Sequence, residues 1–233
     1  MINLAIIPAR GGSKRIPRKN IALLAGKPLI YFTIAAAQQS KFIDRVIVST
    51  EDGEIAAISR SFQAEAQTRS DHLATDAATS IDVVIDVVDR FEESNNVVVG
   101  NIIILQPTSP LRTHLHIDCA LNLFLLKSTD SLVSVVRVPH AFQPSSLMTL
   151  RDGYLKPYLA DKDLPDHETT ANCLYARNGA AIYICTRECL MEKHSLYGDT
   201  TIPFEMSPDV SIDIDEFWDL QLCEMIMKNN VRP

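Results

Sequence analysis

A dense group of cations follows the first apolar run of the chain. Of the 22 lysines and arginines, five lie between Arg10 and Lys19, although the whole chain carries a net charge of -7. Gly11, Gly12 and Ser13 let the backbone turn and direct N–H groups outward, where they can bind an anion together with the side chains of Arg10 and Lys19. These residue types indicate a polyphosphate site. The alternative, a solvated basic loop, is about equally common for an isolated cluster.

The place of this loop favours the polyphosphate site. It follows the apolar run Leu4–Pro8, which is typical of a buried strand. Open α/β sheets bind ligands outside the carboxyl ends of their strands. The loop contains neither the G-x-x-x-x-G-K-[ST] pattern of a P-loop nor the G-x-G-x-x-G dinucleotide fingerprint, so both of those classes of site are excluded.

Two carboxylates near the C-terminus could hold a metal ion. Asp213 and Asp215 alternate with Ile212 and Ile214. On a strand the two aspartates would share one face, with their Cα atoms about 7 Å apart, and would repel each other unless a cation lay nearby. Mg²⁺ suits such ligands and is commonly shared with substrate phosphates. The other interpretation is an acidic helix start that complements the helix dipole. A phosphate loop elsewhere in the chain favours the metal.

Two further polar segments stand next to predicted elements. Leu105–Arg112 follows a buried strand, and in it Gln106 offers a donor and acceptors while Arg112 offers a cation. Arg69–Ser80 is a polar loop that leads into a helix. Each could be ordinary turn chemistry, but a position at the carboxyl end of a strand makes a binding role the better interpretation.

Strand and helix patterns alternate through the first 136 residues. We expect strands at Asn3–Pro8, Arg45–Ser49, Asn101–Leu105 and Ser131–Val136. We expect helices at Leu29–Gln39, Gly53–Ser61, Ser80–Glu93 and Leu115–Leu126, with Ser80 as a possible cap of the third. Strands separated by helices imply right-handed crossovers and a mainly parallel sheet, so the fold class is α/β.

The alternation stops between Pro139 and Arg177. This stretch is too long for a plain loop in a compact domain, so it predicts a β-rich excursion, a lid or an interface arm. The core is then residues 1–138 and 177–233, with 139–176 inserted. After the insert we expect strands at Ala180–Cys185, Thr200–Phe204 and Val210–Ile214, a short helix after the first, and a final helix at Glu216–Lys228.

Composition bounds the function classes. The chain has 233 residues, 46% of them hydrophobic and 22% charged, as in ordinary globular proteins. No apolar run of transmembrane length and no secretory leader pattern is found, and the acidic balance argues against nucleic-acid or anionic-membrane partners. Five cysteines without a C-x-x-C pair indicate reduced thiols and a cytoplasmic protein. Burial is the better interpretation of Cys185 and Cys189 than a metal site.

Four segments together resemble a known motif set. Ala5–Asn20, Arg69–Ser80, Leu105–Arg112 and Ile212–Asp215 are similar, in content and order, to motifs of the N-acylneuraminate cytidylyltransferases, the CMP-sialic acid synthetases and their bacterial nonulosonate relatives. The resemblance spans nearly the whole chain. It implies a Rossmann-like nucleotidyltransferase fold, and transfer of CMP from CTP to the anomeric hydroxyl of a nine-carbon nonulosonic acid with release of pyrophosphate.

The resemblance also implies roles for individual residues. The implied nucleotide-binding residues are Ala9, Arg10, Gly11, Gly12, Ser13, Lys19, Asn20, Arg69, Ala78 and Ser80. The implied sugar-binding residues are Gln106, Arg177, Asn178 and Tyr183. Arg10, Lys19, Asp213 and Asp215 would be catalytic, with Mg²⁺ on the two aspartates. The family usually dimerises through an inserted arm, so we expect a homodimer in which Lys156 or an arm neighbour completes the partner's sugar site.

The chain departs from the family pattern in three places. Ser70 stands where proline is common, Glu51 where aspartate is usual, and the spacing from Asn178-Gly179 to Tyr183 is one residue longer than the commonest form. Pseudaminate relatives usually lack the Asn-Gly pattern, which favours a neuraminate- or legionaminate-type sugar. The octulosonate enzymes lack the Leu105–Arg112 segment. The remaining alternatives are another acid sugar, or a nucleotide-binding regulator without turnover.

Overall fold

The central feature of the fold is a mixed β-sheet. The computed structural model describes residues 2–70, 73, 79–159 and 173–230. In these residues the sheet has eight strands, in the order β10-β7-β11-β6-β1-β4-β5, with β12 also paired to β7. Their bounds are β1 (Ile2–Pro8), β4 (Arg45–Thr50), β5 (Glu65–Thr68), β6 (Val99–Ile104), β7 (Ser131–Arg137), β10 (Tyr175–Arg177), β11 (Tyr183–Thr186) and β12 (Thr201–Glu205).

The expected parallel sheet is confirmed for its core and corrected at one side. β6, β1, β4 and β5 are parallel neighbours. β11 runs antiparallel between β6 and β7, and β10 is antiparallel to β7. The first two strands after the insert, β10 and β11, therefore run opposite to the parallel core, whereas β12 is parallel to β7. Because β11 separates β6 from β7, the backbone that leads into β11 lies beside the carboxyl end of β6.

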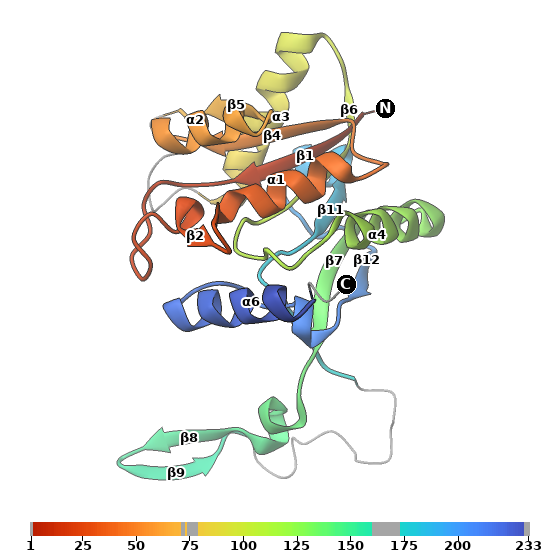
Figure 1. The fold of residues 1–233 in the computed structure, drawn as a ribbon. Coiled ribbons are helices and arrows are strands. Elements are labelled where there is room, and N and C mark those ends of the chain that lie inside the picture. Colours follow the sequence, from red (N-terminus) through yellow and green to blue (C-terminus); the bar gives the residue numbers. More distant parts are fainter. Residues whose placement is uncertain (1, 71–72, 74–78, 160–172, 231–233) are drawn as a thin grey trace.

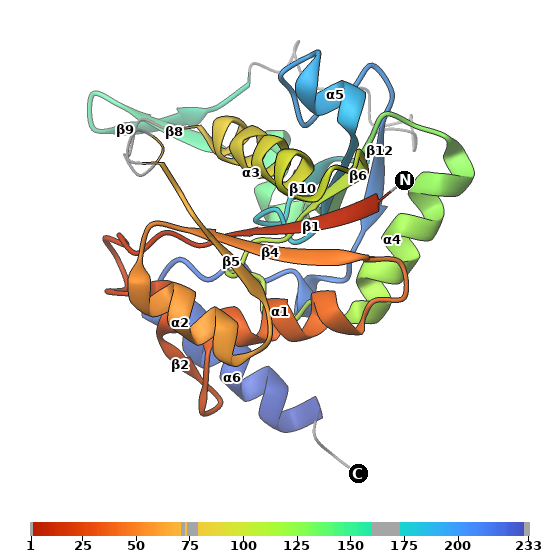
Figure 2. The same ribbon diagram turned by 90° about the horizontal axis from the view of Figure 1, so that it is seen from above.

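Helices cover both faces of the sheet (Figures 1 and 2). One face packs against α1 (Leu29–Gln39), α2 (Gly53–Ser61) and α4 (His114–Lys127), through a cluster that includes buried residues of all three helices. The other face packs against α3 (Ser80–Asn95) and α5 (Arg187–Met191). These two layers hold the carboxyl ends of the parallel strands in fixed register.

The predicted helices agree with these elements to within a few residues, but the cap of α3 was misplaced. Thr79, and not Ser80, is the N-cap, and its hydroxyl accepts from the backbone N–H of Asp82 at 3.2 Å. The Asp82 carboxylate in turn accepts a hydrogen bond from the Thr79 backbone N–H, which completes a capping box. His116 closes a similar box with Thr113 at the start of α4.

The expected strand at Val210–Ile214 is wrong. Pro208–Val210 forms a 3-10 turn, η6, and residues 211–215 have no regular structure. The alternating isoleucines reflect a third apolar cluster, in which Ile212 and Ile214 pack with Leu24 and with Cys223 of α6 (Phe217–Asn230). One backbone bond, from Ile214 N–H to Thr108 O at 2.8 Å, ties this segment to the loop after β6.

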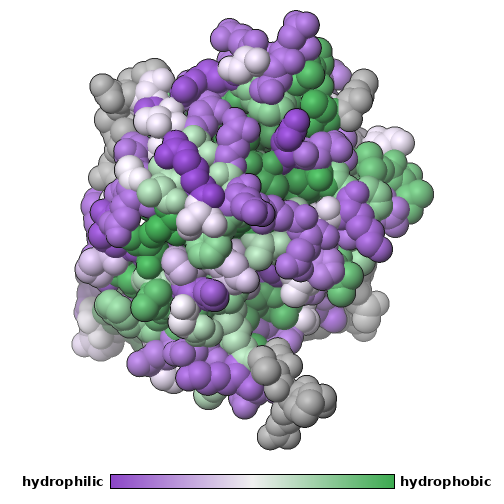
Figure 3. Space-filling model, turned by 45° about the horizontal axis from the view of Figure 1, so that its top comes forward, coloured by the Kyte–Doolittle hydropathy of each residue, from purple (hydrophilic) through white to green (hydrophobic). Residues whose placement is uncertain are grey.

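The remaining elements are small. β2 (Leu23–Leu24) and β3 (Lys27–Pro28) form a two-stranded sheet beside α6, after the turn η1 (Lys19–Ile21). On the face drawn in Figure 3, hydrophilic side chains predominate and apolar ones gather in separate patches. None of the helices in the described part of the chain has the length and apolarity that crossing a bilayer would require.

The described part of the stretch predicted as an insert contains two short turns and a hairpin. After two short turns, η3 (His140–Phe142) and η4 (Pro144–Ser146), a hairpin of β8 (Met148–Arg151) and β9 (Tyr154–Pro157) extends away from the sheet (Figure 1). The chain returns through β10, so the insert rejoins the core two residues before Arg177.

Candidate functional site

The first loop lies at the carboxyl end of β1 and forms one wall of a cavity of about 500 Å³. Of the residues predicted there from the sequence, the cavity is lined by Arg10, Gly12, Ser13, Lys19, Asn20, Arg69, Ser80, Gln106 and Asp215. Lys14, Arg15, Thr79 and Thr108 add to the lining. The three motifs that lie far apart in sequence, together with the acidic segment, therefore meet in one place. Ala78 lies outside the described residues.

Two predicted loop residues frame the cavity instead of lining it. Ala9 is buried, and its backbone N–H donates to Ser49 O at 2.9 Å. The Gly11 N–H, expected to face an anion, donates to the Glu51 carboxylate at 2.6 Å. A Cβ at Gly11 would lie 2.5 Å from Asp52 Oδ2, so glycine at this position allows close packing against the N-cap of α2. From the other side, the Asn20 amide donates to Arg10 O at 2.8 Å.

Lys19 joins the first loop to the acidic segment. Its ammonium donates to Ile214 O at 2.6 Å and to Asp215 Oδ1 at 3.1 Å. Arg15 pairs with the other carboxylate oxygen of Asp215 at 3.0 Å. The hydrogen bond from Lys19 is the main cause of a lowered pKa at Asp215, so this carboxylate is ionised at neutral pH.

Asp213 has the opposite environment. Burial is the main cause of its raised pKa, and its Oδ1 atom is buried without a hydrogen-bond partner. Because residues 211–215 are not a strand, the two aspartates do not form the symmetric pair that the sequence predicted. An orphaned buried carboxylate oxygen next to an ionised one nevertheless suits a hard cation. Across the described residues, no cluster of three or more His, Cys, Asp or Glu forms a metal site, so further ligands would have to come from substrate or water.

A second cavity, also of about 500 Å³, adjoins the first. Both are lined by Thr79, Ser80 and Gln106. The second is otherwise lined by apolar and aromatic groups and one cation: Ile81, Ile104, Gly179, Ala180, Leu196, Tyr183, Tyr197 and Arg177. Arg177 and Tyr183 are therefore placed together, in a cavity that differs in chemistry from the cationic one.

Asp213 lines neither cavity, but it contacts one lining residue of each. Its carboxylate is hydrogen-bonded to Thr108, which lines the first cavity, and it packs against Gly179, which lines the second. Gly179 has φ +68, and a Cβ built there would lie 2.3 Å from Asp213 Cγ. Only glycine both adopts this conformation readily and leaves room for the carboxylate.

Asn178 does not face either cavity. It is buried, its Oδ1 accepts from Ser134 at 2.7 Å, and its Nδ2 donates to Ser211 Oγ at 3.1 Å. The amide thus links β7 to the segment before Asp213. In the structure Asn178 therefore lies outside the lining of both cavities, and its role as a sugar contact stays a prediction.

Arg112, expected to offer a cation to the site, is instead inside the protein. Its guanidinium donates to Gln106 O at 3.1 Å, to Ala181 O at 2.7 Å and to Thr33 Oγ1 at 2.5 Å. Burial lowers the pKa of Arg112 to about 9, which still leaves it charged at neutral pH. The side chain holds the loop after β6 against α1 and the start of β11, and so fixes Gln106 between the cavities.

Sequence reasoning missed several lining residues. Tyr197 and Leu196 lie in a connection before β12 that carries no recognisable motif. Thr108 lies in the Leu105–Arg112 segment, where the sequence analysis named only Gln106 and Arg112 as candidate site residues. The burial predicted for Cys185 and Cys189 is confirmed.

Comparison with known proteins gives consistent matches. Residues 4–227 match the family model described as cytidylyltransferase. A CMP-N,N'-diacetyllegionaminic acid synthase of Legionella pneumophila is 39% identical over 97% of both chains. An N-acylneuraminate cytidylyltransferase of Escherichia coli is 31% identical over 98% of this chain, which spans only 53% of that protein. A pseudaminic acid cytidylyltransferase of Campylobacter jejuni is 29% identical over 99% of this chain and 98% of its own.

Solved structures show the same fold. A CMP-2-keto-3-deoxy-manno-octonic acid synthetase, solved in complex with CTP, superposes with a TM-score of 0.74 at 17% identity and covers 99% of this chain and 100% of its own. A 4-diphosphocytidyl-2C-methyl-D-erythritol synthase superposes at 0.67 with 11% identity, over 97% of this chain and 99% of that one. At these identities the likeness concerns the fold alone.

Gly179→Ala tests the contact with Asp213, and Gly26→Ala is its matched control. Both glycines have positive φ, but a Cβ at Gly26 would meet nothing within 4 Å. Each alanine should lower the free energy of unfolding by about 1–2 kcal/mol, because alanine adopts the left-handed conformation less readily than glycine. Gly179→Ala should lower the free energy of unfolding by about a further 1–3 kcal/mol, because Asp213 must move. Urea denaturation of both variants measures the difference, and equal losses would show that the two residues do not constrain each other.

Proposed function

The chain belongs to the cytidylyltransferase family, and on that premise we propose that it transfers CMP from CTP to the anomeric hydroxyl of a nine-carbon nonulosonic acid of legionaminate or neuraminate type, with release of pyrophosphate. The observation that carries the proposal is the pair of adjoining cavities, one cationic and one largely apolar, that share Gln106. A reaction between a triphosphate and a sugar acid needs two such sites with a common border.

The cationic cavity suits CTP. Arg10, Lys14, Lys19 and Arg69 contribute positive charge in an otherwise acidic protein. Arg69 is held in place by the end of β4, because its guanidinium donates to Ser49 O at 3.0 Å and to Ser49 Oγ at 3.1 Å. Fixed cations of this kind bind phosphates at little entropic cost.

The second cavity suits the sugar acid. Arg177 can pair with a carboxylate, and the apolar groups at Ile81, Ala180 and Leu196 suit the methyl groups of acylamido substituents. The names of the relatives support an acid of this class, since they include synthases for a diacetyllegionaminic acid and for N-acylneuraminates.

In the proposed reaction the sugar hydroxyl attacks the α-phosphorus of CTP in line, the bond to the β-phosphate oxygen breaks, and pyrophosphate leaves. Lys19 and Arg10 would stabilise the charge that develops on the leaving group. Asp213 and Asp215 would hold Mg²⁺, which when bound neutralises phosphate charge. Asp215 is paired with Lys19 and Arg15. A metal ion bound to Asp215 would therefore take the place of these two cations beside the carboxylate. Gln106 would position the sugar at the border of the cavities.

Two alternatives concern the substrate and one concerns turnover. A pseudaminate is supported by a relative of nearly full length, and an octulosonate by likeness of fold alone. Membership of an enzyme family, with Arg10, Lys19, Asp213 and Asp215 all present, favours catalysis over a regulatory role.

Pyrophosphate release tests the proposed reaction. We expect release only when CTP, Mg²⁺ and a nine-carbon keto-acid sugar are all present. The reason is that the reaction joins two substrates that would bind in the two adjoining cavities. Activity with ATP or GTP should be lower by about a hundredfold or more, since a site that hydrogen-bonds cytosine leaves polar groups unpaired with a purine. A panel of legionaminate, neuraminate, pseudaminate and octulosonate sugars identifies the acid. Equal rates with all nucleotides, or no release with any sugar, would refute the proposal.

We also propose that the arm forms a homodimer. On the β8–β9 hairpin, Leu150 and Leu155 are cross-strand partners and are 70% and 67% exposed. Phe142, Tyr154 and Tyr158 of the arm are also exposed. So much apolar surface on an extended hairpin indicates an interface, and a twofold dimer is the commonest closed assembly. Lys156, next to Leu155 on β9, would then reach the partner's sugar site.

Light scattering tests the dimer. The wild type should be dimeric at micromolar concentration, and the Leu150→Ser/Leu155→Ser variant should dissociate at least about tenfold more readily, because two apolar side chains are lost from the contact. Leu126→Ser on α4 is the matched control, since Leu126 is 74% exposed but distant from the arm. A monomeric wild type, or equal dissociation of both variants, would exclude the arm as the interface.

A further inference from the structure

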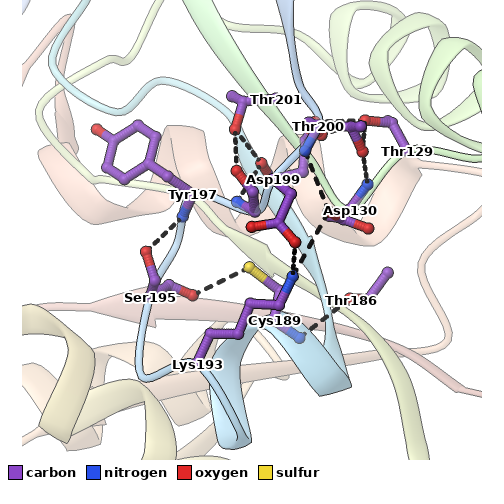
Figure 4. Close-up of polar contacts among 12 residues, drawn as sticks. Thr129, Asp130, Thr186, Cys189, Lys193, Ser195, Tyr197, Asp199, Thr200 and Thr201 are labelled. Atoms are coloured by element: carbon purple, nitrogen blue, oxygen red, sulfur yellow. Dashed lines mark hydrogen bonds and ion pairs between the residues drawn. The ribbon is translucent and has the colours of Figure 1, made fainter.

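The connection between α5 and β12 is held by many hydrogen bonds, although it carries no regular structure over most of its length. Its C-terminal part is tied to the turn before β7. Thr200 N–H donates to Asp130 Oδ2, and Asp130 N–H donates to Thr200 Oγ1, both at 3.1 Å. Lys193 reaches across the loop to Asp199 at 2.8 Å (Figure 4). These reciprocal bonds fix the spacing between the two segments.

The middle of the loop is also held by hydrogen bonds to neighbouring segments. Gly198 N–H donates to Ser131 Oγ at 3.0 Å, and a Cβ at Gly198 would lie 2.1 Å from Asp130 Cβ. Ser195 N–H donates to Cys189 O at 3.3 Å. Tyr197, between these anchors, donates its own N–H to Ser195 Oγ at 3.0 Å. The backbone of Tyr197 is therefore set by polar contacts on both sides.

The side chain of Tyr197 takes no part in this network. Figure 4 shows its ring pointing away from the polar contacts of the loop. The ring packs edge-on against Tyr183, with centroids 6.1 Å apart, and the Tyr197 hydroxyl accepts a hydrogen bond from Arg177 Nη1 at 2.9 Å. All three residues line the second cavity. A hydrogen-bonded loop thus presents the Tyr197 phenol to Arg177, the arginine among the described lining residues of that cavity.

This contact determines what Arg177 can bind. Arg177 is exposed at the end of β10, where an unrestrained arginine would lose side-chain entropy on binding. A guanidinium has five N–H donors, and the phenols of Tyr197 and Tyr183 engage it without cancelling its charge. Burial raises the pKa of Tyr183, so that phenol is neutral as well. An arginine held by neutral groups keeps its charge and its remaining donors for a ligand.

We propose that Tyr197 is a positioning residue that fixes the Arg177 guanidinium for the carboxylate of the sugar acid. The proposal rests on the proposed function, and it adds to it a residue that acts through Arg177. Tyr197 would lower the cost of ordering Arg177 on binding, and its effect should therefore appear in the affinity for the acid and not in the affinity for CTP.

Tyr197→Phe removes only the hydroxyl, so steady-state kinetics of pyrophosphate release give the first test. We expect the KM for the sugar acid to rise about five- to tenfold, the scale of a hydrogen bond to a partly exposed charge. The kcat and the KM for CTP should change by less than about twofold. Tyr31→Phe is the matched control, because Tyr31 on α1 packs against Phe32 and against Phe62 at the end of α2, and its change should alter none of these values.

A double-mutant cycle with Arg177→Met separates positioning from a general structural role. If Tyr197 acts through Arg177, then Tyr197→Phe should raise the KM for the sugar acid by less than about twofold when Arg177 is already absent. A full five- to tenfold effect in that background would overturn the proposal. So would a Tyr197→Phe variant with wild-type kinetics, or one in which the KM values for CTP and sugar rise together. Those outcomes leave the proposed function intact, whereas a wild type without turnover on any sugar acid refutes the proposed function and this inference with it.

Discussion

The close packing of Asp213 on Gly179 is the constraint on which the arrangement of the site depends. Gly179 belongs to the backbone that enters β11, and Asp213 belongs to the irregular segment before α6. Their contact brings these two distant parts of the chain to the loop after β6, to which Ile214 N–H is bonded through Thr108 O. The antiparallel insertion of β11 makes this possible, because it carries Gly179 to the carboxyl end of β6.

Three charged side chains at the site differ in how far their polar atoms are satisfied. Arg112 is buried, but three oxygens accept its hydrogen bonds, so the desolvation of the guanidinium is offset and the loop that carries Gln106 is fixed. Asp215 is ionised between Lys19 and Arg15, which ties the first loop to the C-terminal segment. Asp213, in contrast, retains a buried oxygen without a partner. That unsatisfied group is the clearest sign that the site is built to hold something more than the protein itself.

Much of the scaffold could be predicted from the sequence because local signals determine it. Apolar periodicity located the parallel strands and the helices, and the break after β7 located the arm. The Val210–Ile214 strand was predicted wrongly because its alternating isoleucines pack against α6 and not against a sheet. The cavity contacts of Arg10, Lys19 and Gln106 followed from their positions after strands, a rule that applies to most open α/β sheets.

The rest of the site depends on tertiary contacts that no local pattern records. Arg112 looks like an exposed cation in sequence, yet packing of α1 against the loop buries it. Gly11 N–H was expected to face an anion, but Glu51 approaches it from the end of β4. Asn178 precedes Gly179, and its buried amide is hydrogen-bonded to Ser134 and Ser211. Tyr197 reaches the second cavity from a connection whose shape is set by Asp130, some 67 residues earlier in the chain.

The most direct measurement of the central claim, that Asp213 acts where the two substrates meet, is the single-turnover rate of Asp213→Asn with CTP, Mg²⁺ and the sugar acid. The matched control is Asp209→Asn, the same change in the exposed turn η6. The account predicts that Asp213→Asn slows the chemical step by about two to three orders of magnitude, the scale for loss of a principal electrostatic group, while Asp209→Asn stays within about twofold of the wild type. A wild-type rate in Asp213→Asn, at Mg²⁺ concentrations that limit the reaction, would contradict the account.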